Sequence, residues 1–293
     1  MLKGRLGLET ARVPHVDRQG LLWLGRGMLY VADGTLRFAT RGDANLEAGE
    51  YAVPFQTISN ILLGPGTTVS HDALRLLARH GTGLLAVGED GVRLYSAMPF
   101  GPDDSRVARR QAAMWADEIT RVAVARRMYA WRLGEILPDA DIAVLRGIEG
   151  ARVKRLYQTL AEQHGIRWQG RRYDREDPES ADLANQAINH AASAVEGAAQ
   201  IAVVATGAVP ALGFVHEDSG NAFCLDIADL FRDAVTVPIA FEAVKAHERR
   251  PDGPLERTVR KMVGRALGRQ GVIPSMIDKI KALFDANDRR RDP

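Results

Sequence analysis

The sequence predicts an α+β protein with a β-rich amino-terminal domain and an all-helical carboxy-terminal domain. Three observations support this class: short apolar runs separated by turn signals up to residue 97, a break in composition at residues 98–105, and helical periodicity thereafter. The break holds two prolines, a glycine and two aspartates, which is typical of a linker. We therefore predict domains at residues 1–97 and 106–293, joined by a linker at 98–105.

The first domain is predicted to consist of short strands and one helix. The strands are expected at residues 21–24, 28–32, 35–39, 57–63, 83–87 and 92–97. Asp33-Gly34 is typical of a two-residue hairpin turn, and residues 89–91 are expected to form the turn of a second hairpin. Leucine spacing within residues 71–80 predicts a short helix.

The second domain is predicted to consist of helices alone. They are expected at residues 105–133, 141–163, 182–206, 221–233, 239–247, 255–267 and 273–284. Ser105 is expected to cap the first of them. The helix at 182–206 is rich in alanine, so we expect it at the packed centre of a bundle. The polar tail at 289–293 is expected to fray.

The composition is that of an ordinary globular protein, with 46% hydrophobic and 26% charged residues. The single cysteine, Cys224, excludes a disulfide framework and a zinc-finger cluster, and it fits a reducing cytoplasm. No signal peptide and no apolar run long enough for a bilayer is evident, so we expect a cytoplasmic protein without a membrane partner. The net charge is +2 and arginine dominates the basic residues, which permits DNA binding but also reflects what a GC-rich genome encodes.

The segment at residues 213–232 carries the side chains that a metal site needs. Asp226 and Asp229 are three apart on a predicted helix, so their carboxylates project from nearly the same side, and His216 precedes them across a turn. Such like charges need a cation or an arginine between them, and a histidine with two carboxylates suits Mg²⁺ or Mn²⁺. The alternative is that Asp226 is solvated, Asp229 pairs with Arg232, and His216 is an ordinary loop residue.

Glu149 is the candidate for a further carboxylate from a separate element. It lies between Gly147 and Gly150 inside a predicted helix, where each glycine costs about 1 kcal/mol relative to alanine. We expect the two glycines to allow another backbone or a ligand to come close. The alternative is that Glu149 pairs with Arg152 on a solvated face.

Several segments together resemble the CRISPR adaptation integrase, the larger of the two proteins that insert new spacers into a CRISPR array, in its type I-E form. The likeness rests on residues 145–155, 170–174 and 213–230, and on 65–71 and 87–93 of the β half, and it covers nearly the whole chain. This resemblance implies the two-domain fold described above and a homodimer. It also implies a small ferredoxin-like partner protein that bridges two such dimers.

The resemblance also implies the chemistry of the site. Glu149, His216 and Asp229 match the metal ligands of the family, Asp226 matches a further catalytic acid, and the ion is Mg²⁺ or Mn²⁺. The implied reaction is a transesterification, in which the 3′-hydroxyl of a captured double-stranded DNA fragment attacks a phosphodiester at the edge of the CRISPR repeat. A divalent ion would activate the hydroxyl, neutralise the phosphate and orient the attack.

A DNA-contacting face is a further implication of the resemblance. Its expected residues are Arg26, Arg75, Arg93, Tyr173, Arg257, Arg260 and Arg265. Arg26 stands where well-known type I-E relatives carry an aromatic residue, in an amino-terminal hairpin, that wedges the ends of the fragment apart. In the pocket that reads the protospacer-adjacent motif, Tyr173 matches the relatives, whereas Ser219 replaces a lysine and Leu225 replaces a tyrosine.

Three functions follow from these patterns. The first is a metal-dependent DNA integrase and endonuclease of CRISPR adaptation. The second is a structure-selective, metal-dependent DNA nuclease that uses the same site with water. The third is a non-catalytic DNA-binding scaffold, and the retention of Glu149, His216, Asp226 and Asp229 argues against it.

Overall fold

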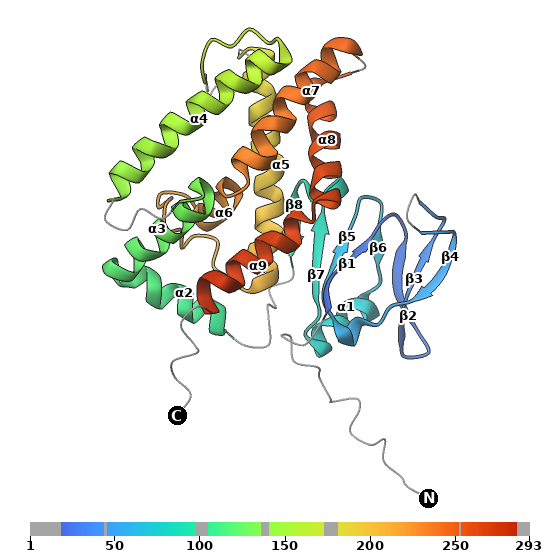
Figure 1. Ribbon diagram of the computed structural model, residues 1–293. Helices are drawn as coiled ribbons and strands as arrows, with labels where there is room; N and C mark the ends of the chain where they lie inside the picture. The colour runs from blue at the N-terminus through green and yellow to red at the C-terminus, as the bar shows by residue number, and fades with distance from the viewer. Residues whose placement is uncertain are drawn as a thin grey trace, which may run out of the picture. The chain divides into compact units, whose positions relative to one another are not determined.

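The structure is a computed structural model that describes residues 19–43, 46–97, 105–135, 141–172, 181–251 and 253–285. Its strands come first along the chain and its long helices follow, so the predicted α+β class is confirmed (Figure 1). Contacts divide the chain into two compact units, Met1–Gly88 with Tyr95–Ser105, and Glu89–Leu94 with Arg106–Pro293. The expected linker lies almost entirely outside the described residues, so its boundaries stay a prediction.

The first sheet of the β-rich unit is built around a fully buried strand. Its order is β1 (Gln19–Leu24), β5 (Ile58–Leu63), β7 (Gly83–Val87) and β8 (Leu94–Ala97). β5 is parallel to both β1 and β7, and each of its residues is buried. A strand covered on both faces does not alternate between apolar and polar positions, and in β5 even the polar Ser59 and Asn60 are buried.

The second sheet contains the hairpin that the sequence predicted. Its order is β4 (Gly49–Ala52), β3 (Thr35–Thr40), β2 (Met28–Ala32) and β6 (Thr68–Val69). β2 and β3 are antiparallel, and both turn residues, Asp33 at φ 51° and Gly34 at φ 73°, are left-handed, as a type I′ turn requires. Helix α1 (His71–His80) begins at the Ser70 cap, and its buried Leu77 joins a core that both sheets share.

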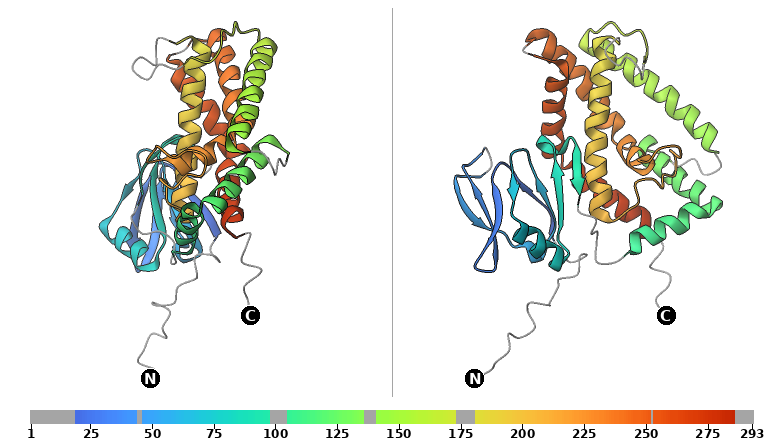
Figure 2. Two further views of the ribbon diagram at one scale, coloured as in Figure 1. Left: turned by 90° about the vertical axis from the view of Figure 1, so that its left-hand side faces the viewer. Right: turned by 180° about the vertical axis from the view of Figure 1, so that it is seen from behind.

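The helical unit is arranged around one central helix. Its helices are α2 (Arg106–Ala116), α3 (Glu118–Leu133), α4 (Ile142–His164), α5 (Leu183–Thr206), α6 (Ala222–Asp229), α7 (Val237–Arg249), α8 (Leu255–Arg269) and α9 (Val272–Asp285). α5 is buried over most of its length and packs against α6, α7, α8 and α9, which confirms its predicted place (Figures 1 and 2). No helix within the described ranges is long and apolar enough to cross a membrane.

Two predicted helices are interrupted. The segment expected to form one helix at 105–133 forms α2 and α3 instead, because the Asp117 side chain accepts a hydrogen bond from the Thr120 amide and starts a new helix there. The segment expected at 221–233 ends as α6 at Asp229 and is followed by a π-helix at Arg232–Thr236. Within α6, burial raises the pKa of Cys224 to about 12, so this thiol behaves as a small hydrophobic side chain.

Another segment of backbone comes close to a helical glycine at Gly197, and not at Gly147 or Gly150 as expected. A Cβ added to Gly147 or Gly150 would meet nothing within 4 Å, so the expectation of another backbone close to these glycines is wrong, while the expectation of a ligand there stays a prediction. A Cβ added to Gly197 of α5 would instead lie closer than 3.0 Å to the Val92 carbonyl oxygen. Residues 89–94 therefore pack directly on the bundle, which explains why they belong to the helical unit rather than to the predicted β domain.

This packing predicts opposite effects for two glycine-to-alanine substitutions. Gly197→Ala should lower the free energy of unfolding by about 1–3 kcal/mol, because the methyl group overlaps backbone that has no room to move. Gly147→Ala, on an open helix face, should raise it by about 0.5–1 kcal/mol through better helix propensity. Urea unfolding of both variants measures the two values, and equal stability would contradict the close contact at Val92.

Candidate functional site

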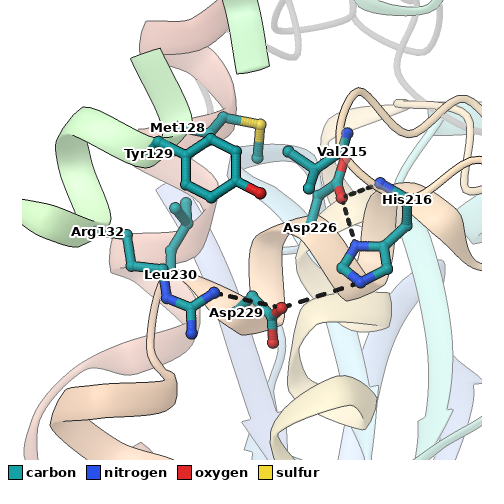
Figure 3. Close-up of a pocket in the computed structure, with 8 residues that line it drawn as sticks. All are labelled: Met128, Tyr129, Arg132, Val215, His216, Asp226, Asp229 and Leu230. Atoms are coloured by element: carbon teal, nitrogen blue, oxygen red, sulfur yellow. Dashed lines mark hydrogen bonds and ion pairs between the residues drawn. The ribbon is translucent and has the colours of Figure 1, made fainter. Parts of the chain in front are cut away.

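A small pocket lies where α3, α6 and the loop between α5 and α6 meet (Figure 3). Its volume is about 20 Å³. The residues that line it are Met128, Tyr129 and Arg132 of α3, Val215 and His216 of the loop, and Asp226, Asp229 and Leu230 at the end of α6. The segment at residues 213–232 therefore packs against α3, a helix in which no site residue was predicted.

Asp226 is the anchor of the loop. Its side chain is buried and accepts hydrogen bonds from the backbone amides of Phe214 at 2.6 Å, Val215 at 3.1 Å and His216 at 2.9 Å. The interpretation of Asp226 as a solvated helix residue is therefore wrong. A buried amide left without an acceptor costs about 1–3 kcal/mol, so Asp226 fixes the loop conformation strongly.

His216 is oriented by the same carboxylate. Its Nδ1 lies 2.8 Å from Asp226 Oδ1, and because a carboxylate only accepts, Nδ1–H must donate. Nε2 then carries the lone pair and lies 4.0 Å from Asp229 Oδ2. The bond to Asp226 raises the pKa of His216 above its ordinary value against the opposing effect of burial. A histidine held by a carboxylate at one nitrogen is the usual arrangement of a metal-ligating histidine.

Asp229 uses its two oxygens differently. Oδ1 accepts from Arg232 Nε at 2.9 Å and from Arg232 Nη2 at 2.6 Å. The expected Asp229–Arg232 pair is therefore present, but it engages only one oxygen. Oδ2 lies between the His216 ring and Arg132 (Figure 3), and its distance from Arg132 Nη1 is 3.5 Å.

Glu149 reaches the same place from α4. Its Oε1 lies 2.7 Å from Arg132 Nη1, and the Arg132 side chain is only 5% exposed. The alternative pairing with Arg152 is wrong, because Arg152 pairs with Glu135. Glu149 and Asp229, which are far apart in the sequence, thus share one buried guanidinium. His216 lies beside Asp229 as well, with Nε2 4.0 Å from Oδ2.

These residues fit a divalent cation by their chemistry. Two carboxylate oxygens and an imidazole nitrogen with a carboxylate behind it form a donor set suited to Mg²⁺ or Mn²⁺. As the side chains stand, no three His, Cys, Asp or Glu residues of the described chain are grouped closely enough to hold an ion. The positive charge between Glu149 and Asp229 is that of Arg132. Arg132 was not predicted as a site residue, because nothing in the sequence distinguishes it from the other arginines of its helix.

Other supporting residues were also missed, because their partners lie far away in the sequence. Gln111 of α2 is fully buried, donates to the carbonyls of Val209 and Leu212, and accepts from the Val209 amide. Trp115 Nε1 donates to the Gly213 carbonyl at 2.9 Å. These bonds fix the start of the loop that carries His216, and a lone polar residue on a helix gives no sequence signal for them.

A larger pocket of about 450 Å³ adjoins the site through His216. It is lined by Arg146, Val215, His216, Glu217, Asp218, Ser219 and Leu225. Ser219 and Leu225, the two departures in the expected motif-reading pocket, thus lie in one cavity beside the candidate ligands. Tyr173, the third residue of that prediction, lies outside the described residues.

The expected DNA-binding arginines occupy both units. Arg26 is exposed in the connection between β1 and β2, which belong to different sheets, so it does not lie in a hairpin as expected. Arg75 of α1 is exposed and pairs with Asp72 at 3.0 Å. In the helical unit, Arg93 and Arg260 both pair with Glu256 of α8. Arg257 and Arg265 are also on α8, and both are exposed.

Comparisons with known proteins agree with this architecture. The family described as CRISPR associated protein Cas1 matches residues 22–137 and 132–258. The CRISPR-associated endonuclease Cas1 of Escherichia coli (strain K12) is 36% identical over 92% of this chain and 87% of its own length, and its namesake from Geobacter sulfurreducens is 36% identical over 94% and 87%. A crystal structure of a TtCas1–DNA complex has a TM-score of 0.80 at 30% identity, covering 94% of this chain and 99% of that one. A casposase bound to an integration product shares the fold, with a TM-score of 0.65 at 16% identity over 92% and 97% of the two chains.

The raised pKa of His216 predicts a pH-dependent contribution to stability in the presence of a chelator. A histidine whose folded pKa exceeds the ordinary 6.5 stabilises the fold fully below that value and loses the effect as pH rises through the folded pKa. The melting temperature of His216→Gln should therefore fall furthest below wild type under acidic conditions, and the gap should narrow as pH rises.

The matched control removes the charge that causes the shift. In an Asp226→Asn background, adding His216→Gln should change the melting temperature by an amount that no longer varies with pH. A pH-dependent gap that persists without Asp226 would show that another group raises the pKa of His216.

Proposed function

Because the chain belongs to the CRISPR-associated protein Cas1 family, we propose that it is a metal-dependent DNA integrase and endonuclease of CRISPR adaptation. The observation that carries the proposal is the convergence of Glu149, His216 and Asp229 from three segments of the chain. Relatives with 36% identity are named endonucleases, which supports phosphodiester chemistry. We propose the type I-E form on the resemblance of residues 145–155, 170–174 and 213–230.

The proposed reaction assigns a task to each side chain. Glu149, His216 and Asp229 would hold Mg²⁺ or Mn²⁺, which when bound would favour ionisation of the attacking hydroxyl and neutralise charge on the phosphate. Asp226 keeps His216 in the tautomer with Nε2 facing the site, and Arg232 keeps Oδ2 of Asp229 turned inward. The 3′-oxygen of the captured fragment would bond to the target phosphorus, and the 3′-oxygen of the repeat strand would leave with a proton.

The proposed partners are the DNA fragment, the CRISPR repeat, a second copy of the chain and a small ferredoxin-like protein. One of the similar solved structures is a TtCas1–DNA complex, which supports DNA as a ligand of this chain. Phosphate contacts would come from the arginines at positions 26, 75, 93, 257, 260 and 265, because guanidinium groups bind phosphate oxygens in pairs. Tyr173 is proposed as a motif-reading residue on the resemblance alone.

A second candidate function is a structure-selective DNA nuclease, which is favoured by the similarity to CRISPR-associated endonucleases. It would use the same residues, with water in place of the 3′-hydroxyl. The two reactions differ in their product rather than in their site, so a strand-joining assay distinguishes them.

The deciding assay combines the protein and its small partner with Mn²⁺ or Mg²⁺, a short duplex with 3′ overhangs, and a supercoiled plasmid that bears the repeat. Covalent joining of the duplex to the plasmid is the expected product. Cutting without joining would favour the nuclease, and DNA retention without any strand change would favour a binding scaffold and contradict the proposed chemistry.

Substitutions at the site sharpen this assay. Asp229→Asn or His216→Ala should lower joining by about 100-fold or more, because each removes a proposed ligand, while duplex affinity stays close to wild type. Asp278→Asn on α9 is the matched control, since this exposed acid lies outside the site. Joining at the wild-type rate by both site variants would show that the site is misassigned.

The proposal also predicts the assembly of the isolated protein. Both ends of one fragment must be joined and each chain supplies one site, so a two-fold dimer is the simplest arrangement. Light scattering at micromolar concentration should give twice the 32.0 kDa of the chain. A monomeric mass would contradict this part of the proposal.

A further inference from the structure

Arg132 occupies the centre of the acidic cluster. Its Nη1 lies 2.7 Å from Glu149 Oε1 and 3.5 Å from Asp229 Oδ2, and its Nη2 lies 3.8 Å from Asp233 Oδ1. One buried side chain of α3 thus meets carboxylates from α4, from α6 and from the π-helix. Its position is the one that a cation shared by these acids would take.

Hydrogen bonding alone does not account for this position. Arg132 Nε and Nη2 are buried without a hydrogen-bond partner, and so is Asp233 Oδ1. Buried donors are nearly always paired, so the guanidinium is held mainly by the charge of the surrounding carboxylates. Arg232 differs, because it makes two short hydrogen bonds to Asp229 Oδ1. Of the two arginines on Asp229, Arg232 is therefore held by two hydrogen bonds to Oδ1, whereas Arg132 makes a single 3.5 Å contact with Oδ2.

The atoms that Arg132 engages are those proposed to bind the ion. Divalent Mg²⁺ binds oxygen at about 2.0–2.1 Å. An ion bound to Glu149 Oε1 and Asp229 Oδ2 would have to share the space beside these oxygens with Nη1, which lies 2.7 Å and 3.5 Å from them. The divalent ion and the Arg132 guanidinium would then lie within a few ångströms of each other, and two positive charges that close repel strongly even in a polar protein interior.

We propose that Arg132 is an internal counter-ion that holds the carboxylates together in the metal-free protein and competes with the divalent cation for them. This inference rests on the proposed metal site. Binding of the ion then requires the guanidinium to withdraw, so Arg132 weakens the affinity of the free protein for metal while it stabilises the metal-free fold. Its role is therefore distinct from that of a ligand, whose loss weakens metal binding.

The test is a Mn²⁺ titration of the chelator-treated full-length protein, followed by electron paramagnetic resonance of the free ion. Arg132→Met should lower the Kd for Mn²⁺ by about tenfold or more, because a competing positive charge is removed. Arg132→Lys keeps a charge and should lie near wild type. Arg152→Met is the matched control, because this arginine of α4 binds Glu135 and the Leu133 carbonyl rather than the acids of the cluster, and the Kd of this variant should be unchanged.

Thermal unfolding supplies a second readout that remains useful if the variant is unstable. Without metal, Arg132→Met should melt below wild type, because the carboxylates then repel one another, and saturating Mn²⁺ should raise its melting temperature more than that of wild type. A variant that folds only in the presence of Mn²⁺ would also support the inference.

Two results separate failure of this inference from failure of the proposed function. If wild type binds Mn²⁺ and His216→Ala does not, but Arg132→Met binds Mn²⁺ no more tightly than wild type, Arg132 is a structural ion-pair partner and the counter-ion role is wrong. If neither wild type nor Arg132→Met binds Mn²⁺, the proposed metal site fails and this inference falls with it.

Discussion

The helical unit depends on keeping several like charges close together inside the protein. Glu149, Asp226, Asp229 and Asp233 come from α4, α6 and the π-helix, and each needs a compensating partner. Glu149, Asp229 and Asp233 form ion pairs with arginine. Asp226 instead accepts hydrogen bonds from backbone amides and from the His216 ring. The Arg132 side chain is only 5% exposed, and removing one member of a buried charge pair typically costs about 3–5 kcal/mol, so these pairs help to hold α3, α4 and α6 together.

The same constraint explains how an irregular loop becomes a precise site. Three amides of residues 214–216 bind one buried carboxylate, and Gln111 binds the carbonyl of Leu212, two residues before this stretch. The His216 ring therefore has one orientation, with Nδ1 on Asp226 and Nε2 toward Asp229. A histidine held in one orientation suits the proposed function, because phosphoryl transfer requires groups that are positioned in advance.

The sequence predicted the fold well wherever the signal is local. The Asp33-Gly34 turn, the strand β5 and the alanine-rich α5 were all predicted from short patterns. The break between α2 and α3 at Asp117 was not predicted, because a single capping residue does not interrupt the helical spacing of apolar residues. At the site, the prediction of Asp226 and Asp229 came from their spacing on one helix. The prediction of Glu149 came from its neighbouring glycines, which face open space in the structure, and from the family resemblance. Arg132 could not be predicted, because only the packing of α3 against α4 and α6 shows which arginine faces the acids.

The central claim is that Glu149, His216 and Asp229 form one cation site in exchange with Arg132. Its most direct test is anomalous X-ray diffraction from crystals of the protein grown with Mn²⁺, compared with crystals grown in chelator. The account predicts one anomalous peak bounded by Glu149 Oε1, His216 Nε2 and Asp229 Oδ2, with the Arg132 guanidinium displaced from those oxygens. A peak elsewhere, or no peak with Mn²⁺ present at millimolar concentration and Arg132 still on Glu149, would contradict it.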